Sequence, residues 1–143
     1  MINKFRGKYG FLSNFYSCII TYEGLTYTSV EAAFQASKTL NPNVREKFTR
    51  IPPDEAKKLG RRVNLRDDWE SCKLSVMEDL IRIKFSNEYL KTLLLNTSTE
   101  YIEEGNSWGD TYWGTCNGVG ENHLGKILMK VRDELIENRR QEL

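Results

Sequence analysis

The sequence has few of the residues that usually hold metals or form crosslinks. Its 143 residues include only three cysteines and one histidine. Cys18, Cys72 and Cys116 are widely separated and form no CxxC pair, which indicates reduced thiols in a cytoplasmic compartment, with no disulfide framework and no zinc site. A single histidine argues against a histidine-based metal centre or a Ser-His triad. We therefore expect no metal and no cofactor, and a chemistry based on carboxylates, lysine or bound water.

Long apolar runs are also lacking, and the formal net charge is only +1. Apolar residues nowhere continue for the roughly 18 positions that a membrane span needs. The first residues, MINKFRGKYGF, contain no apolar core of a signal peptide. With 21 basic and 20 acidic residues, bulk charge does not favour binding along nucleic acid, which leaves only a local basic patch and transient nucleic-acid contact. We expect a cytoplasmic protein without a membrane partner, and the oligomeric state stays open.

What is present is typical of one globular domain over residues 1–143. Hydrophobic residues make up 39% and aromatic residues 11% of the chain. Two β-prone runs, 19–22 and 25–28, meet at Glu23-Gly24 and predict a hairpin. Apolar periodicity and capping residues predict helices over 30–40, 43–50, 54–59, 67–85, 87–95 and from 122 on, with a short strand at 100–103. The predicted fold class is α+β, mainly helical, with a small sheet.

Residues 103–125, EEGNSWGDTYWGTCNGVGENHLG, are the most informative stretch and are called the glycine–tryptophan segment below. Apolar residues do not recur in it at a helical or strand period. Glycine permits close approach of the backbone and tryptophan offers a stacking surface, which indicates a pocket wall. The alternative is a turn-rich loop whose tryptophans plug the core. In the same way Asp110 is either a desolvated carboxylate poised for chemistry or the cap of its own loop.

The predicted helix over 30–40 carries an acid, an amide and an amine on one side. At 100° per residue, Glu31, Gln35 and Lys38 fall within a strip roughly 60° wide. Small residues and Leu40 occupy the opposite side. The strip faces either a pocket or solvent.

Three other groups are candidates for ligand contacts. Arg61, Arg62 and Arg66 can bind phosphate through their guanidinium forks, or they can pair with nearby acids. The stretch FLSNFY at 11–16, with Asn14 and Phe15, can stack a base or pack onto the core. Asn122 is placed to cap the last helix, whose free N–H groups can bind an anion, although glycines before a helix cap are a weak signal.

Five motifs together resemble the NADAR superfamily, which includes the YbiA-like N-glycosidases. They are FLSNFY (11–16), TSVEAAFQASK (28–38), GRRVNLRDDWE (60–70), EEGNSWGDTYWG (103–114) and GVGENHLGKILMKVR (118–132). The resemblance covers nearly the whole chain and implies a compact YbiA-like fold that acts on nucleotide-type ribosides. Some members of the family resemble glycosidases of riboflavin biosynthesis that cleave phosphoribosylaminopyrimidine intermediates. Others resemble hydrolases that remove ADP-ribose from nucleobases, guanine in particular.

The resemblance also implies site residues. By their positions in the family motifs, the resemblance implies that the catalytic residues are Glu31, Lys38 and Asp110. The implied or candidate substrate-binding residues are Asn14, Phe15, Gln35, Arg61, Arg62, Trp69, Glu104, Trp108, Trp113 and Asn122. Because Glu103 and Glu104 are adjacent, either of them can correspond to the acid of the family motif.

Two mechanisms and one rival function stay open. Carboxylates can stabilise the cation that develops at the anomeric carbon and activate water. Lys38 can instead capture the ring-opened sugar as a Schiff base. The rival function is a non-catalytic module that binds ADP-ribose or NAD, and the intact Glu31, Lys38 and Asp110 argue against it.

Overall fold

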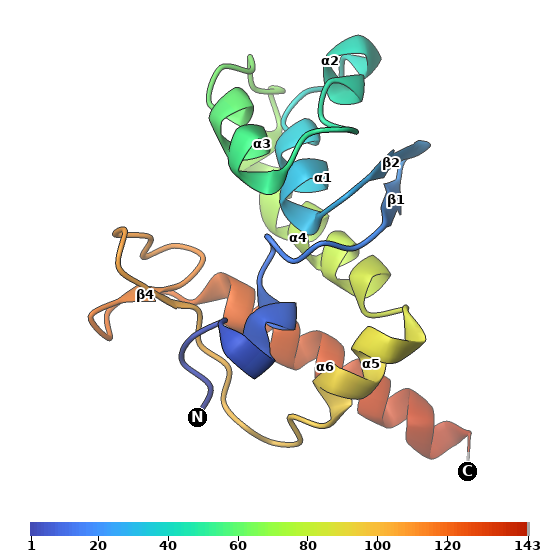
Figure 1. Ribbon diagram of the computed structural model, residues 1–143, viewed down its shortest axis with the longest axis vertical. Coiled ribbons are helices and arrows are strands. Elements are labelled where there is room, and N and C mark those ends of the chain that lie inside the picture. Colours follow the sequence, from blue (N-terminus) through green and yellow to red (C-terminus); the bar gives the residue numbers. More distant parts are fainter. Residues whose placement is uncertain (143) are drawn as a thin grey trace. The chain divides into compact units, whose positions relative to one another are not determined.

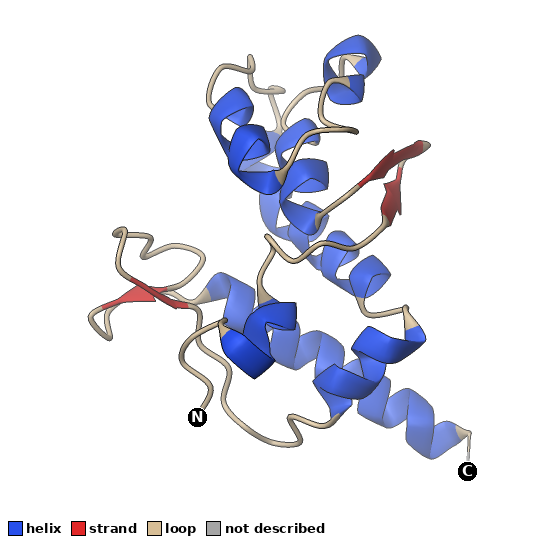
Figure 2. Cartoon of the chain, in the orientation of Figure 1, coloured by secondary structure: helices blue, strands red, loops and turns tan. Residues whose placement is uncertain are grey.

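The computed structural model describes residues 1–142 and divides them into two compact units (Figure 1). Unit 1 comprises residues 1–13 and the described residues from 85 on, and unit 2 comprises residues 14–84. Helices dominate and the strands are short (Figure 2), which confirms the predicted mainly helical α+β class. The single domain expected over residues 1–143 stays a prediction.

Unit 2 begins with the predicted hairpin. Strands β1 (Ile20–Tyr22) and β2 (Leu25–Tyr27) are antiparallel, with Thr21 opposite Thr26. Glu23 and Gly24 both have positive φ, 48° and 88°. Two left-handed residues suit the right-handed twist of a tight hairpin, so the turn forms where the sequence placed it.

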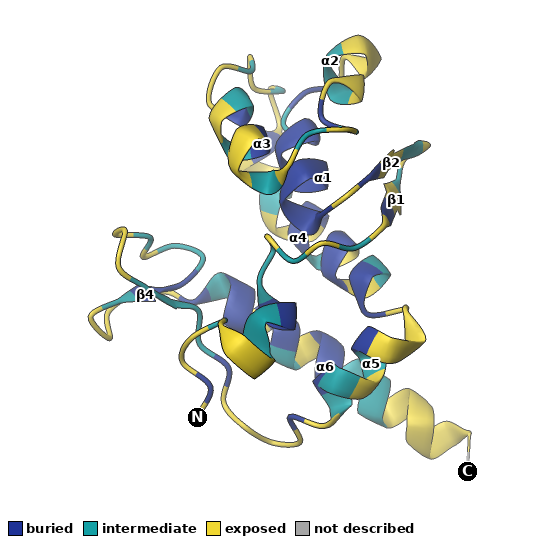
Figure 3. Cartoon of the chain, in the orientation of Figure 1, coloured by how far each residue is buried: buried dark blue, intermediate teal, exposed yellow. Residues whose placement is uncertain are grey.

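Helix α1 (Val30–Ala36) is buried along its whole length (Figure 3). Ser29 caps it, since the Ser29 Oγ accepts the N–H of Ala32 at 3.0 Å. The helix ends earlier than predicted: the Ser37 hydroxyl donates to the Ala33 carbonyl at 2.8 Å, and the chain continues as turns. Leu40 therefore lies outside the helix and is 65% exposed, which corrects the expectation that it packs with the small residues.

Three helices surround α1 in unit 2. Helix α2 (Pro42–Glu46) is capped by Asn41, and helix α3 (Pro53–Gly60) begins at the second of two prolines. Both α3 and the longest helix of the unit, α4 (Trp69–Lys84), pack against α1. On α4, Met77, Leu80 and Ile81 are buried, whereas Leu74 is 39% exposed.

Unit 1 is built around helices η1 (Gly7–Leu12), α5 (Glu88–Leu95) and α6 (His123–Gln141). Helix α5 packs against both η1 and α6, and the rings of Phe11 and Phe85 meet edge to face at 6.3 Å. Four residues form the buried face of α6, and Leu135, one turn after the last of them, is half-buried. The four buried residues are Leu124, Ile127, Leu128 and Val131.

The strand expected at residues 100–103 is wrong. Ile102 makes only a single parallel bridge, with Ile2. The parallel pair lies instead within the glycine–tryptophan segment, between β3 (Gly105–Asn106) and β4 (Thr115–Cys116). Across the described part of the chain, every helix is too short or too polar to cross a bilayer.

Candidate functional site

The buried strip on α1 carries Glu31 and Gln35 as predicted. Glu31 is 8% exposed and Gln35 is 6% exposed. The Gln35 Nε2 donates to the Glu31 Oε1 at 3.3 Å, and the backbone N–H of Glu31 donates to the carbonyl of Asn14 at 3.0 Å. Ionisable side chains are rarely this buried without a partner or a function. The carboxylate is therefore held in a fixed position, out of bulk water.

Lys38 lies just beyond α1 and is electrostatically coupled to Glu31. Burial lowers the pKa of the Lys38 amine, the Glu31 carboxylate opposes that shift, and the Arg61 guanidinium adds to it. The backbone of Lys38 is fixed at both ends, since its N–H donates to the carbonyl of Gln35 and its own carbonyl accepts the N–H of Arg66 at 2.7 Å. The strip thus combines a buried carboxylate with an amine that holds its proton less tightly than a free lysine.

Asn14 contacts the strip through its backbone carbonyl, and Phe15 follows it in the chain. The Asn14 Oδ1 is buried and accepts no hydrogen bond from the described residues, while its Nδ2 contacts the Met77 sulfur at 3.6 Å. Phe15 is 43% exposed, and the Lys57 amine lies 6.0 Å from the centre of its ring. Its ring is thus accessible to a ligand, as the alternative in which FLSNFY stacks a base requires.

The three arginines separate into two groups. Arg66 forms a bidentate ion pair with Asp68, with N–O distances of 2.6 and 3.0 Å, so here the pairing alternative is the correct one. Arg61 and Arg62 are exposed, and neither makes an ion pair within residues 1–142. Of the three arginines, Arg61 and Arg62 are therefore the ones available to bind an anion.

Trp69 belongs to the core of unit 2. The side chain is 5% exposed, and its ring centre lies 5.1 Å from that of Phe34. A buried ring that packs on a neighbouring aromatic offers no open face for a base. The substrate-binding role that the family motif implies for Trp69 stays a prediction, and its surroundings are those of a core residue.

Asp110 closes the loop in which it lies. One carboxylate oxygen, Oδ1, accepts the N–H groups of Tyr112 and Trp113 at 3.1 and 2.9 Å. Asn106 holds the same loop by exchanging two hydrogen bonds with the backbone of Asp110. This is the loop-cap alternative for Asp110. The other oxygen, Oδ2, has no hydrogen-bond partner among the described residues.

The two tryptophans of the glycine–tryptophan segment differ in exposure. Trp108 is 60% exposed, beside Gly109 with φ of +84°. Trp113 is half-buried and meets the Tyr112 ring edge to face at 4.9 Å, and Tyr112 in turn lies 4.5 Å from the ring of His123. Trp113 is thus oriented by packing, whereas Trp108 presents its ring to solvent.

Asn122 precedes α6 but does not cap it. Its side chain is buried and bonds to backbone elsewhere: Oδ1 accepts the N–H of Glu104 at 3.0 Å, and Nδ2 donates to the carbonyl of Ile102 at 2.9 Å. The expected side-chain cap is wrong. The first N–H groups of α6, from His123 and Leu124, donate to loop carbonyls, which leaves them unavailable for an anion.

The neighbouring acids Glu103 and Glu104 are both half-buried. Glu103 accepts the Thr115 hydroxyl at 2.6 Å, so its carboxylate supports the β3–β4 pair. Within residues 1–142, histidine, cysteine, aspartate and glutamate form no group of three or more that could hold a metal ion.

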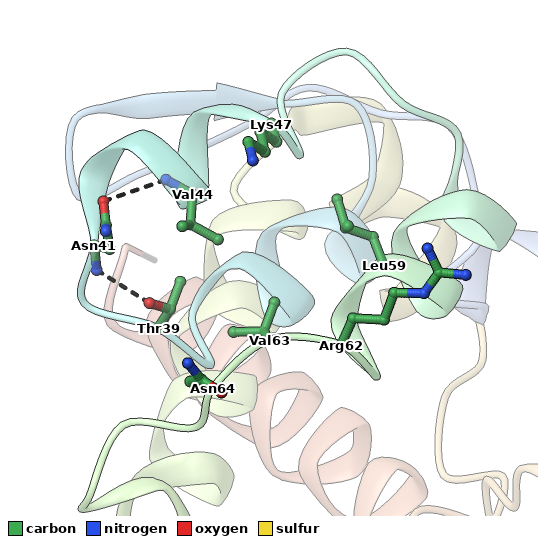
Figure 4. A pocket seen from close by; sticks show the side chains of 8 residues that line it. All are labelled: Thr39, Asn41, Val44, Lys47, Leu59, Arg62, Val63 and Asn64. Carbon is green, nitrogen blue, oxygen red and sulfur yellow. Dashed lines mark hydrogen bonds between the residues drawn. The ribbon is translucent and has the colours of Figure 1, made fainter.

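Unit 2 contains a cavity of about 450 Å³, which lies around α2 and the end of α3 (Figure 4). Of its polar lining residues, only Arg62 is among the ligand-binding candidates predicted from the sequence. The complete lining is Thr39, Asn41, Val44, Lys47, Leu59, Arg62, Val63 and Asn64. Lys47 lies outside the five family motifs, and Asn64 lies within the motif at 60–70 without having been a candidate site residue.

Comparisons with known proteins agree with the motif resemblance. A family model described as the NADAR domain matches residues 3–136. The chain is 39% identical over 132 residues to N-glycosidase YbiA of Shigella boydii, covering 89% of this chain and 82% of that protein. It is 38% identical to a riboflavin biosynthesis protein of Vibrio vulnificus, of which it covers 36%. The solution structure of Escherichia coli YbiA matches with a TM-score of 0.85 and 36% identity, over 97% of this chain and 87% of that one.

Proposed function

Because this chain belongs to the NADAR domain family, we propose that it is an N-glycosidase that hydrolyses the N-glycosidic bond of a nucleotide-type substrate. The observation that carries the proposal is the buried Glu31 carboxylate, held by Gln35 and coupled to Lys38. Perturbed ionisable groups at buried positions are concentrated at functional sites. The name of the Shigella relative, N-glycosidase YbiA, supports this class of reaction, and the name of the Vibrio relative supports a link to riboflavin biosynthesis.

In the first route, Glu31 stabilises the positive charge that develops at the anomeric carbon as the base departs. Water then adds to that carbon, its proton passes to a carboxylate, and the leaving nitrogen takes up a proton. Burial increases the effect of the carboxylate, because charge interactions are stronger away from water. Asp110, whose Oδ2 is not used by its loop, is the second carboxylate assigned to this route.

In the second route, the neutral amine of Lys38 attacks the anomeric carbon. The C–N bond to the base breaks, and the leaving nitrogen takes up the proton that the attacking amine loses. The ring oxygen then leaves the anomeric carbon and takes up a proton as the imine forms, and water adds to the imine carbon, releases the sugar and restores the amine. The lowered pKa of Lys38 supplies more neutral amine at a given pH than an exposed lysine would.

The substrate is proposed at the level of two classes. One is a phosphoribosylaminopyrimidine of riboflavin biosynthesis, and the other is ADP-ribose attached to a nucleobase, guanine in particular. We favour the ADP-ribosylated base, with Phe15, Trp108 and Trp113 as stacking residues and Arg61 and Arg62 as phosphate ligands. Phe15 and Trp108 have accessible rings, which supports this assignment.

Turnover of both substrates by the same protein preparation tests the proposal. Release of free base from either one supports hydrolysis, and the ratio of kcat/KM identifies the class. Unchanged substrate that elutes together with the protein would instead indicate a non-catalytic module that binds ADP-ribose.

Glu31→Gln is the decisive variant, because it keeps the shape of the side chain and removes its charge. We expect turnover to fall by roughly 10²-fold or more. Glu55→Gln on the exposed side of α3 is the matched control and should leave turnover unchanged. Near-normal activity of Glu31→Gln would overturn the catalytic assignment.

A further inference from the structure

The cavity around α2 and the end of α3 has an apolar floor and a cationic rim. Val44, Leu59 and Val63 are half-buried and supply the apolar part, while Lys47 and Arg62 are exposed at the edge. Figure 4 shows Val44 entering from α2, Leu59 from α3, and Val63 from the segment that follows. No acidic side chain lines the cavity.

The polar side chains of the rim are available for a ligand. Lys47, Arg62 and Asn64 make no side-chain hydrogen bond or ion pair within the described residues. Asn41 uses its Oδ1 to cap α2, through the N–H groups of Asn43 and Val44 at 2.9 and 3.4 Å, and its Nδ2 has no partner there. Two cations and two amide groups thus point to an oxygen-rich anion, which is the chemistry that guanidinium and ammonium groups bind best.

The size and the apolar floor indicate more than a bare phosphate. A volume of about 450 Å³ lies within the range of roughly 300–1,000 Å³ that is usual for small-molecule sites. Ligand sites typically combine an apolar lining with a few polar groups that fix the orientation. A nucleoside phosphate fits this pattern, with its base on the three aliphatic side chains and its phosphate at Lys47 and Arg62.

The cavity is also continuous in sequence with the strip on α1. Thr39 in its lining follows Lys38 directly, and Arg62 follows Arg61, whose charge acts on the Lys38 amine. We propose that this cavity binds a nucleoside phosphate portion of the substrate that lies away from the bond being cleaved. The proposal rests on the N-glycosidase function and assigns Lys47, Arg62 and Asn64 to substrate affinity.

Ligand binding to the cavity is measured with probes that are not turned over, so that this proposal can be refuted independently of the proposed reaction. The probes are AMP and inorganic phosphate, titrated into the ¹⁵N-labelled protein while the amide signals are followed by NMR. We expect AMP to shift the side-chain amides of Asn41 and Asn64 and to bind more tightly than phosphate. Absence of AMP binding at millimolar concentration, or equal affinity for both probes, would overturn the proposal.

Two variants and one control connect the cavity to catalysis. Lys47→Gln and Arg62→Gln should each weaken AMP binding at least about threefold, as expected for exposed charge contacts, and raise KM for the substrate by a similar factor with little change in kcat. Lys58→Gln removes an exposed charge from α3 outside the cavity and should change neither quantity. Weaker AMP binding with an unchanged KM would overturn the assignment to substrate. A protein that binds AMP but turns over nothing would refute the N-glycosidase function, and with it the substrate role of the cavity.

Discussion

The side chain of Gln35 fills the space that a side chain at position 60 would need. Its Oε1 lies 1.9 Å from the position of an ideal Cβ on Gly60, and its Cδ lies at 2.7 Å. Gly60 is the last residue of α3 and is itself buried. The glycine thus lets α3 approach α1 closely enough to enclose the amide that holds Glu31.

We expect Gly60→Ala to displace Gln35 and to reduce the free energy of unfolding by about 1–3 kcal/mol, the usual cost of overpacking a core. Turnover should fall as well, because the Gln35–Glu31 hydrogen bond would be disturbed. Urea denaturation and steady-state kinetics measure the two effects. Gly10→Ala is the control, since nothing lies within 4 Å of the added methyl group, and its stability should stay close to that of the parent protein. Equal stability of both variants would refute the close-packing argument.

The Schiff-base route makes a prediction about pH. Because the pKa of Lys38 is lowered from 10.5, the neutral amine becomes abundant at a lower pH than for a free lysine. Trapping with cyanoborohydride in the presence of substrate should therefore yield an adduct at Lys38 whose amount rises with pH below 10.5. The charges of Arg61 and Glu31 act on the Lys38 pKa in opposite directions. Arg61→Gln removes a charge that lowers this pKa and should shift the rise in adduct to higher pH, whereas Glu31→Gln removes a charge that raises it and should shift the rise to lower pH.

The control for trapping is Lys38→Arg, which keeps the charge and cannot form the imine. An adduct that persists in Lys38→Arg would place the reaction at another lysine. Complete absence of an adduct in a protein that still turns over substrate would leave the carboxylate route as the mechanism.

Asp110 offers a way to separate loop structure from charge. Asp110→Asn keeps an oxygen that can accept from the N–H groups of Tyr112 and Trp113, and it removes the negative charge. We expect stability within about 0.5 kcal/mol of the parent protein, as for a substitution that preserves its contacts, and a large loss of turnover. Asp110→Ala should lose stability as well, by about 1–3 kcal/mol, because backbone donors lose their acceptor. Full activity of Asp110→Asn would show that the residue serves only as a loop cap.

Local sequence signals predicted the elements of the fold well. The turn at Glu23-Gly24 depends on neighbours along the chain and was predicted, and both of its residues have positive φ angles. Ser29, which caps α1, directly precedes the predicted helix over 30–40. The strip of Glu31 and Gln35 follows from helical geometry alone, and the hydrogen bond between them confirms it.

The errors concern residues whose surroundings come from distant parts of the chain. Asn122 bonds to the backbone around Ile102 and Glu104 and not to its own helix, which no local pattern indicates. The substrate-binding role that the family motif implies for Trp69 stays a prediction, and the ring that packs against it, Phe34, is distant in sequence. Burial and pairing partners are set by tertiary contacts, whereas turns and caps are set by a few adjacent residues.

Lys84 is the buried residue that sequence reasoning passed over, although it continues the apolar face of Met77, Leu80 and Ile81 on α4. The side chain is 1% exposed, and its amine lies 5.4 Å from the centre of the Tyr16 ring. Burial lowers the pKa of Lys84 to about 8, while the nearby Cys18 acts in the opposite direction. The folded protein therefore binds this proton more weakly than the unfolded chain, whose lysine pKa is near 10.5.

It follows that between pH 8 and 10.5 the unfolded state carries more protons at Lys84, and stability should rise with pH because of this group. The full difference corresponds to roughly 3 kcal/mol. The measurement is the free energy of unfolding of the parent protein minus that of Lys84→Met, at pH 7 and at pH 9.5. Taking the difference cancels the titration of Tyr22 and Tyr27, whose pKa shifts do not involve Lys84. Both proteins carry Cys18→Ala, because Lys84 lowers the pKa of the Cys18 thiol and the variant would otherwise change that titration. We expect the parent protein to gain on the variant as the pH rises. A constant difference would mean that the folded protein holds the Lys84 proton as tightly as the unfolded chain does, and that the aromatic ring of Tyr16 compensates for the loss of water.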